Sequence, residues 1–169
     1  MRGAFVPPVV LLLATAPFVA SCDRTPANAP TTMAVKAGDK TFNCRLALDP
    51  DSRELGMGGV TSIGPDEGML FAFPDAQDRT FWMRGCVIDL DIAFMDAMGF
   101  VTAVHTMPKE PPQGPDESEE AYRARLVRYP SAGRAKYALE VAPGALAPLG
   151  IRRGSRIEFD REALKPLIR

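Results

Sequence analysis

Two aspartates and a glutamate are the residues best suited to do chemistry in this chain. Asp89 and Asp91 are two positions apart in an apolar stretch, so on a strand their side chains would share one face. Carboxylates placed this way could bind a divalent cation through oxygen or act as an acid–base pair. Glu140 lies among apolar residues of a later stretch and could join them. The alternative is a solvated strand face, on which Asp91 or Glu140 hydrogen-bonds to backbone and stabilises the sheet.

Trp82 and Arg84 come shortly before the two aspartates. An aromatic wall beside a few polar groups is the usual composition of a small-molecule or glycan site. The candidate ligand-binding residues are therefore Trp82, Arg84, Asp89, Asp91 and Glu140. No catalytic residue is assigned, because no serine lies in a Gly-x-Ser-x-Gly motif and the chain has a single histidine. No Asp-x-Asp-x-Asp-Gly loop is present, and we predict neither a metal nor a cofactor.

The N-terminal segment is typical of a targeting signal. Arg2 precedes an apolar stretch from Phe5 to Phe18 that is interrupted by prolines and is too short to span a bilayer as a helix. It ends in Val19-Ala20-Ser21-Cys22, which resembles a bacterial lipobox, with valine in place of the usual leucine. We predict a lipoprotein signal peptide over residues 1–21 and lipid attachment at Cys22. The alternative is an ordinary secretory signal, which would release a secreted protein.

The predicted location follows from this anchor. Acyl chains on Cys22 would hold the protein at a membrane, and Asp23 resembles the enteric signal for retention in the inner membrane, facing the periplasm. Residues 22–40 have no strong period and are predicted to be a flexible tether. The net charge of −1 gives no basic surface for nucleic acid, so we expect no nucleic-acid partner.

If Cys22 carries lipid, the chain has two further cysteines. Cys44 and Cys86 each share the strand parity of apolar neighbours, so both sulfurs are expected to face the core. In an oxidising compartment they could form a disulfide. The alternative is a pair of buried free thiols, which pack as small hydrophobic groups.

Short strands joined by turns account for most of the remaining sequence. Sixteen prolines and fourteen glycines suit this arrangement, and period-two alternation marks half-buried strands. The fold class we predict is mainly β, a small, mostly antiparallel barrel-like sheet with one or two short helices. The barrel-like domain is expected over residues 41–160, followed by a C-terminal tail over 161–169. Strands are predicted at 41–48, 68–74, 80–83, 87–95, 100–107, 136–142 and 156–160, with helices at 51–56 and 116–127.

The stretch GMLFAFPDAQDRTFWMRGCVIDLDIAFMDAMGFV (68–101) resembles the core of the family known as domain of unknown function 192. The motifs at 52–56, 129–131, 138–141 and 150–155 resemble further parts of that family in the same order. The resemblance implies a compact β-rich domain, often secreted or anchored, and implies no particular reaction. The chain departs from the family pattern at 56–60, at Cys86, at Asp89 and in a longer loop at 108–128.

Three functions are open at this point. The leading hypothesis is a non-enzymatic binding or interaction module, anchored by lipid in the bacterial cell envelope, with a small-molecule, glycan or protein ligand. The second is an envelope hydrolase that uses Asp89, Asp91 or Glu140. The third is a structural subunit of an envelope complex, contacted through loop 108–128.

Overall fold

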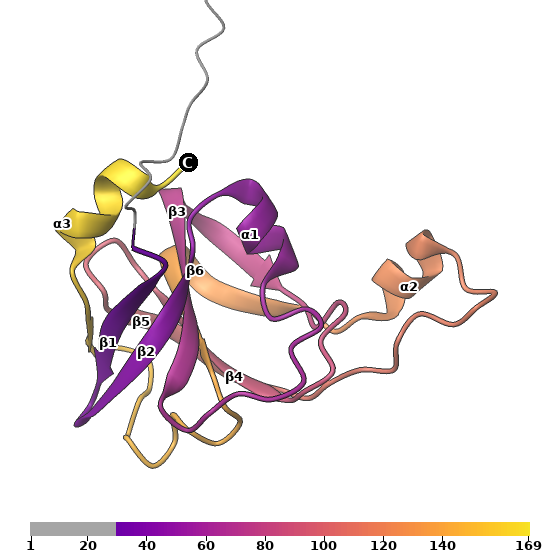
Figure 1. Ribbon diagram of the computed structural model, residues 1–169, viewed down its shortest axis with the longest axis horizontal. Helices are drawn as coiled ribbons and strands as arrows, with labels where there is room; N and C mark the ends of the chain where they lie inside the picture. The colour runs from indigo at the N-terminus through magenta and orange to yellow at the C-terminus, as the bar shows by residue number, and fades with distance from the viewer. Residues whose placement is uncertain (1–29) are drawn as a thin grey trace, which may run out of the picture.

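The computed structural model describes residues 30–169 and contains one seven-stranded sheet in the order β5-β4-β6-β3-β2-β1-β7. All pairs are antiparallel except β2 with β3, which are parallel. The sheet curls into a half-barrel (Figure 1), which confirms the predicted fold class. The strands are β1 (Thr32–Ala37), β2 (Lys40–Ala47), β3 (Glu67–Phe81), β4 (Leu90–Met95), β5 (Val101–Met107), β6 (Tyr129–Val141) and β7 (Ile157–Glu158).

Helices in the described part of the chain are short. They are α1 (Pro50–Leu55), α2 (Glu119–Arg125) and α3 (Arg161–Leu164), with a 3-10 turn, η1 (Lys165–Leu167), directly after α3. The sequence predicts a cap for the first helix at Asp51, but the cap is Asp49, whose carboxylate accepts a hydrogen bond from the Ser52 backbone N–H at 2.9 Å. Pro50 explains the shift, because proline fits the first helical position, where no N–H partner is needed. Over residues 30–169, no helix has the length and apolar character needed to span a membrane.

Both faces of the sheet are apolar, because successive strand residues point to opposite sides. One cluster contains Phe42, Cys44 and Leu139 and also packs against Leu164 of α3. We call this side the Cys44 face. The other cluster contains Phe71, Ile92 and Cys86. Glu140 pairs with Ile92 across the sheet and so points to that side, which we call the Glu140 face.

Strand β3 is longer than the sequence predicts. Two strands are expected at 68–74 and 80–83, but one strand runs through Pro74 from Glu67 to Phe81. Its register against β6 shifts between Ala72 and Gln77 and again near Thr80. Proline is tolerated at such irregularities because no ladder hydrogen bond is required of it there. The continuous strand carries three phenylalanines toward one end of the Glu140 face.

The folded domain extends beyond the predicted bounds of 41–160. Residues Thr32–Ala37 form β1 between β2 and β7, so this part of the predicted tether belongs to the sheet. The C-terminal tail is also docked, since Leu164 is fully buried and the Arg169 N–H donates to the Leu48 carbonyl at 2.8 Å. The predicted signal peptide, Cys22 and the tether up to residue 29 lie outside the described residues.

Candidate functional site

A pocket of about 230 Å³ lies on the Glu140 face, between α1 and the end of β3. The elements that form it are the helix, its C-terminal glycine, the aromatic end of β3 and one side chain of β6. Gly56 ends α1 with a φ of 50°, a conformation that favours glycine. The residues lining the pocket are Arg53, Glu54, Leu55, Gly56, Met57, Phe71, Phe73, Thr80, Phe81, Trp82, Arg84, Cys86 and Glu140.

Glu140 supplies the buried carboxyl group of this pocket. Its side chain is 5% exposed, and its Oε2 atom has no hydrogen-bond partner. Burial raises the pKa of the Glu140 carboxyl from 4.5 to about 8, against a smaller lowering effect of Arg45. At neutral pH the carboxyl is therefore mostly protonated, and it can donate one hydrogen bond as well as accept others.

Aromatic rings fix the pocket wall. Phe81 makes edge-to-face contacts with Phe71 and Phe94, with ring centroids 5.0 and 5.1 Å apart. Trp82 follows on the rim, where the Arg128 guanidinium lies 4.0 Å from its ring centroid. The wall is therefore apolar and held by packing in place before any ligand arrives.

The arginines of the pocket already have partners. Arg53 donates to the carbonyl of Ala72 at 3.0 Å and to that of Arg169 at 2.7 Å. Arg84 forms an ion pair with Glu119 of α2 at 2.8 Å. A ligand anion would have to compete with these contacts, so the arrangement suits a mostly apolar ligand that hydrogen-bonds to Glu140.

Two of the candidate residues lie away from this pocket. Asp91 is 2% exposed and lies on the Cys44 face, since it pairs with Val141 while Glu140 pairs with the next residue, Ile92. Its carboxylate accepts hydrogen bonds from the Thr106 hydroxyl at 2.8 Å and from the Leu146 backbone N–H at 3.2 Å.

Asp89 is exposed and precedes β4, where its carboxylate accepts from the Lys109 N–H at 2.8 Å. The expectation that Asp89 and Asp91 share a strand face is wrong, because β4 begins only at Leu90. Trp82, Arg84 and Glu140 do meet in one pocket. Within residues 30–169, no group of three or more His, Cys, Asp or Glu side chains is arranged to hold a metal ion.

The possible disulfide between Cys44 and Cys86 is not formed. Both thiols are free and buried, and they belong to the clusters on opposite faces of the sheet. Gly68 packs directly against the Cys44 side chain, because a Cβ atom added at Gly68 would lie only 3.0 Å from the Cys44 Sγ atom. Burial raises the pKa of each thiol to about 12, so both stay protonated and unreactive.

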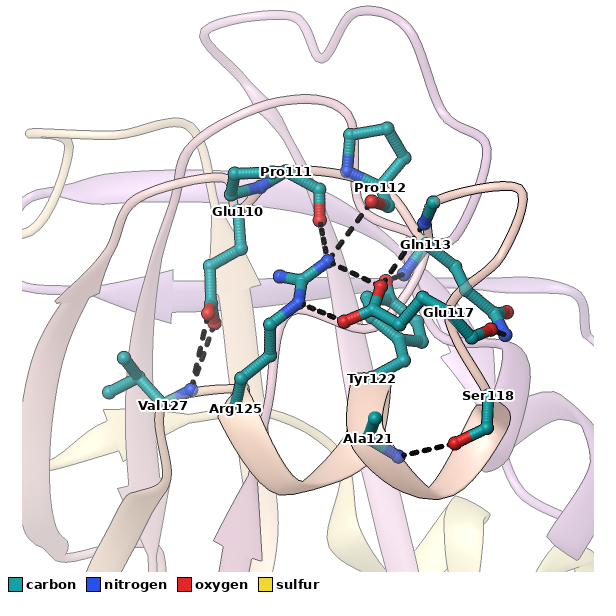
Figure 2. A network of polar contacts seen from close by, with 12 residues as sticks. Glu110, Pro111, Pro112, Gln113, Glu117, Ser118, Ala121, Tyr122, Arg125 and Val127 are labelled. Atoms are coloured by element: carbon teal, nitrogen blue, oxygen red, sulfur yellow. Dashed lines mark hydrogen bonds and ion pairs between the residues drawn. The ribbon is translucent and has the colours of Figure 1, made fainter.

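The loop at 108–128 is an ordered excursion that projects from the sheet and carries α2 (Figure 1). Arg125 organises it, with its guanidinium donating to the Glu117 carboxylate at 2.6 Å and to the Pro111 and Pro112 carbonyls at 3.0 Å (Figure 2). Glu110 accepts from the Val127 N–H at 3.1 Å. These contacts fold the loop onto itself, around the buried side chains of Tyr122 and Leu126.

The excursion also holds the rim of the pocket. The Tyr122 hydroxyl accepts a hydrogen bond from the Gly85 N–H at 3.1 Å, and Glu119 pairs with Arg84. Arg128 stacks on Trp82. Two pocket residues named from the sequence, Trp82 and Arg84, are thus positioned by a segment that is far from them in the chain.

Most of the pocket wall is absent from the sequence-based candidates. Phe71 and Phe73 have the same parity in β3, which is a signal that they share a face. Phe81 joins them only because β3 continues through its irregularities, and Met57 only because α1 ends at Gly56. The end of α1 at Gly56 agrees with the predicted end of the first helix, but the continuation of β3 past Pro74 has no clear sequence signature.

A curled β half-barrel with a mostly apolar pocket on one face of its sheet is the class of protein that this geometry defines. The chain belongs to the family DUF192, described as Uncharacterized ACR, which matches residues 32–159. This confirms the resemblance seen in the sequence, and the matched segment begins with β1. A comparison with curated proteins finds no match.

Solved structures with a similar fold include two bacterial proteins. One is described as a "putative transcription regulator" from Sinorhizobium meliloti 1021, with 28% identity, a TM-score of 0.59, and coverage of 76% of this chain and 91% of that chain. The other is a protein of unknown function from Novosphingobium aromaticivorans DSM 12444, with 29% identity, a TM-score of 0.61, and coverage of 75% and 83%.

Proposed function

We propose that this protein is a lipid-anchored binding module of the bacterial cell envelope whose ligand occupies the Glu140 pocket. The observation that carries the proposal is the Glu140 carboxyl, which is buried at an apolar pocket with its Oε2 atom unpartnered. Leaving such a group buried and unsatisfied costs about 1–3 kcal/mol. A ligand that hydrogen-bonds to it would recover this free energy.

The pocket favours a small ligand with a flat apolar body and one hydrogen-bonding group. Phe71, Phe81 and Trp82 offer ring surfaces, and protonated Glu140 can pair with an N–H, an O–H or a carbonyl oxygen. The engaged arginines leave little free positive charge for an anion. Such a ligand can bind while these arginine contacts stay in place.

The geometry argues against the hydrolase alternative. A pair of carboxylates must face the same reacting group to act as acid and base, but Asp91 and Glu140 point to opposite faces of the sheet. Asp89 lies outside the pocket and is bonded to the Lys109 backbone. Glu140 alone retains access to a pocket.

The structural-subunit role stays a second candidate because of one observation. An apolar groove of about 530 Å³ runs between the excursion and the body of the domain, lined by Val87, Pro111, Pro112 and Tyr122 among others. A protein partner seated there would contact loop 108–128. Deleting residues 109–127 would then abolish the complex, whereas Trp82→Ala, which changes the Glu140 pocket, would leave the complex intact.

Indole is a suitable probe for the pocket, because it combines a flat ring with one N–H donor. We expect indole to raise the melting temperature of the full chain and to bind at least ten-fold more weakly to Trp82→Ala and to Glu140→Leu, which removes the hydrogen-bonding group, in calorimetry. Asp89→Asn is the matched control and should bind as the unmodified chain does. Equal binding by Trp82→Ala and the unmodified chain would contradict the pocket assignment.

The anchor has its own experiment. Cells fed labelled palmitate should label the unmodified chain and Cys44→Ser, but not Cys22→Ser, and the last variant should leave the membrane fraction. Separation of inner from outer membranes tests the expectation from Asp23. Labelling that persists in Cys22→Ser would reject lipid attachment at Cys22, and an unmodified chain that takes up no label would leave the secreted form.

A further inference from the structure

The turn between β4 and β5 presents two large apolar side chains to solvent among arginines. Met98 is 57% exposed and Phe100 is 42% exposed. Arg152, Arg153 and Arg156 come from the loop before β7 and are all exposed. We call these five residues the hairpin patch.

Backbone contacts make the hairpin patch a fixed surface. The Ile157 N–H donates to the Gly99 carbonyl at 3.0 Å, and the Val101 N–H donates to the Ser155 carbonyl at 2.8 Å. Phe100 and Arg156 form an isolated antiparallel bridge, with the guanidinium 5.8 Å from the ring centroid. The apolar and basic groups therefore lie side by side although they are far apart in the chain.

The arginines of the hairpin patch make no direct contact with a carboxylate in the described residues, although the exposed Glu158 and Asp160 follow Arg156 in the chain. Arg152, Arg153 and Arg156 form no ion pair there. The nearest acidic side chain of the turn, Asp96, is directed inward, where it accepts from the Met98 and Phe100 N–H groups at 2.8 and 3.0 Å. A neighbouring arginine, Arg161, donates to the Met98 carbonyl and adds a further cation.

We propose that the hairpin patch docks on an anionic phospholipid surface. Exposed apolar side chains ringed by cations are the combination that binds the bilayer interface, where the apolar groups enter the headgroup region and the cations meet phosphates. Each arginine near an anionic surface contributes about 1 kcal/mol, which is about a five-fold factor in the docking equilibrium.

This inference rests on the proposed anchor at Cys22. Nine peptide steps separate Cys22 from Thr31, and they span at most about 30 Å, so the anchored domain must stay close to the bilayer. The Thr31 carbonyl accepts a hydrogen bond from the Leu46 N–H. The Leu48 carbonyl accepts one from the Arg169 N–H, two residues after η1. The segment α3–η1 thus links the start of the described chain to the hairpin patch, and Figure 1 shows α3 and the start of β1 together at one end.

Fluorescence quenching can locate the surface that meets the membrane. The full chain, purified from membranes, would be reconstituted in vesicles of brominated phosphatidylcholine, with or without phosphatidylglycerol, and flotation would show that it is anchored. We expect the added fluorescence of Met98→Trp to be quenched in the anionic vesicles and much less in the neutral ones. Val127→Trp is the matched control, because Val127 is 50% exposed on the excursion at the other end of the molecule.

The combined variant Arg152→Gln, Arg153→Gln and Arg156→Gln, made in the Met98→Trp chain, tests the role of charge. Its docking equilibrium should fall by about 100- to 200-fold, so that quenching is lost while the protein still floats with the vesicles. Equal quenching in neutral vesicles, or quenching at position 127 and not at 98, would overturn the docking proposal and leave the anchor intact. A chain that does not float overturns both.

Discussion

Asp91 and Glu140 are buried carboxyl groups on neighbouring strands, yet their surroundings are opposite. Asp91 points to the Cys44 face, where the Thr106 hydroxyl and the Leu146 N–H satisfy it. Glu140 points to the opposite face, where it lines the pocket and its Oε2 atom has no hydrogen-bond partner. The difference teaches that burial alone does not mark a functional acid. What separates the two is whether the fold supplies the hydrogen bonds that the group needs.

The contrast assigns different roles to the two faces. Asp91 connects β4 to the edge strand β5 and to the loop after β6, so its contribution is to stability. Glu140 contributes no described hydrogen bond at Oε2 and is destabilising whenever it is charged. Such a group fits the ligand-binding role that we propose for the Glu140 pocket.

The largest effect should appear in the pH dependence of stability. The folded pKa of Glu140 is about 8, above the ordinary 4.5, so the folded state binds this proton more tightly than the unfolded chain. Stability from Glu140 is therefore complete below pH 4.5 and is lost as the pH rises to about 8, by about 5 kcal/mol. Urea unfolding at several pH values should show this loss in the unmodified chain and not in Glu140→Gln. Parallel profiles for the two chains would contradict a neutral buried Glu140.

Replacing Asp91 by alanine should give the next largest effect. The Leu146 N–H, which is buried, would lose its acceptor, and the Thr106 hydroxyl would lose its partner. We expect a loss of about 3 kcal/mol in the free energy of unfolding at constant pH. Asp91→Asn is the control and should lose about 1 kcal/mol, since the amide can still accept from Leu146 and donate to the Thr106 oxygen. An alanine variant as stable as the unmodified chain would remove the distinction between the two acids.

Thr106→Val tests the weaker half of the Asp91 site. The substitution keeps the branched shape but removes the donor to Asp91, and Thr106 itself is exposed. We expect about 1 kcal/mol of destabilisation, measured by the same unfolding experiment. Indole binding should be unchanged, because Thr106 is on the Cys44 side of β5. Altered binding in this variant would show that the two faces are coupled.

The sequence carried the strand pattern well and the site only in part. Alternation of apolar residues predicts most strands, because each face of the sheet has its own cluster. It misses β1, whose small and polar residues are weakly periodic, and it divides β3 at Pro74. It also places Asp89 and Asp91 together, because parity cannot show that the strand starts between them.

From the sequence, Trp82, Arg84 and Glu140 are predicted only as parts of a ligand-binding patch, without the pocket that they line. Their meeting depends on which strands are neighbours, and β6 lies between β3 and β4 only after residues 129–141 return to the sheet. The missing partner of Glu140 is a property of packing in three dimensions. Local spacing cannot reveal it.

Strand β1 has a consequence for how the chain folds. One of its neighbours is β2, directly after it, but the other is β7, with Lys36 opposite Glu158. The hydrogen bond from the Arg53 guanidinium to the Arg169 carbonyl likewise joins residues 116 positions apart. Such distant contacts slow folding, because closing a long loop costs conformational entropy before the new contacts stabilise the chain. Until β7 has paired with β1, the edge of β1 is open. A second, partly folded copy of the chain could then pair with this edge and aggregate.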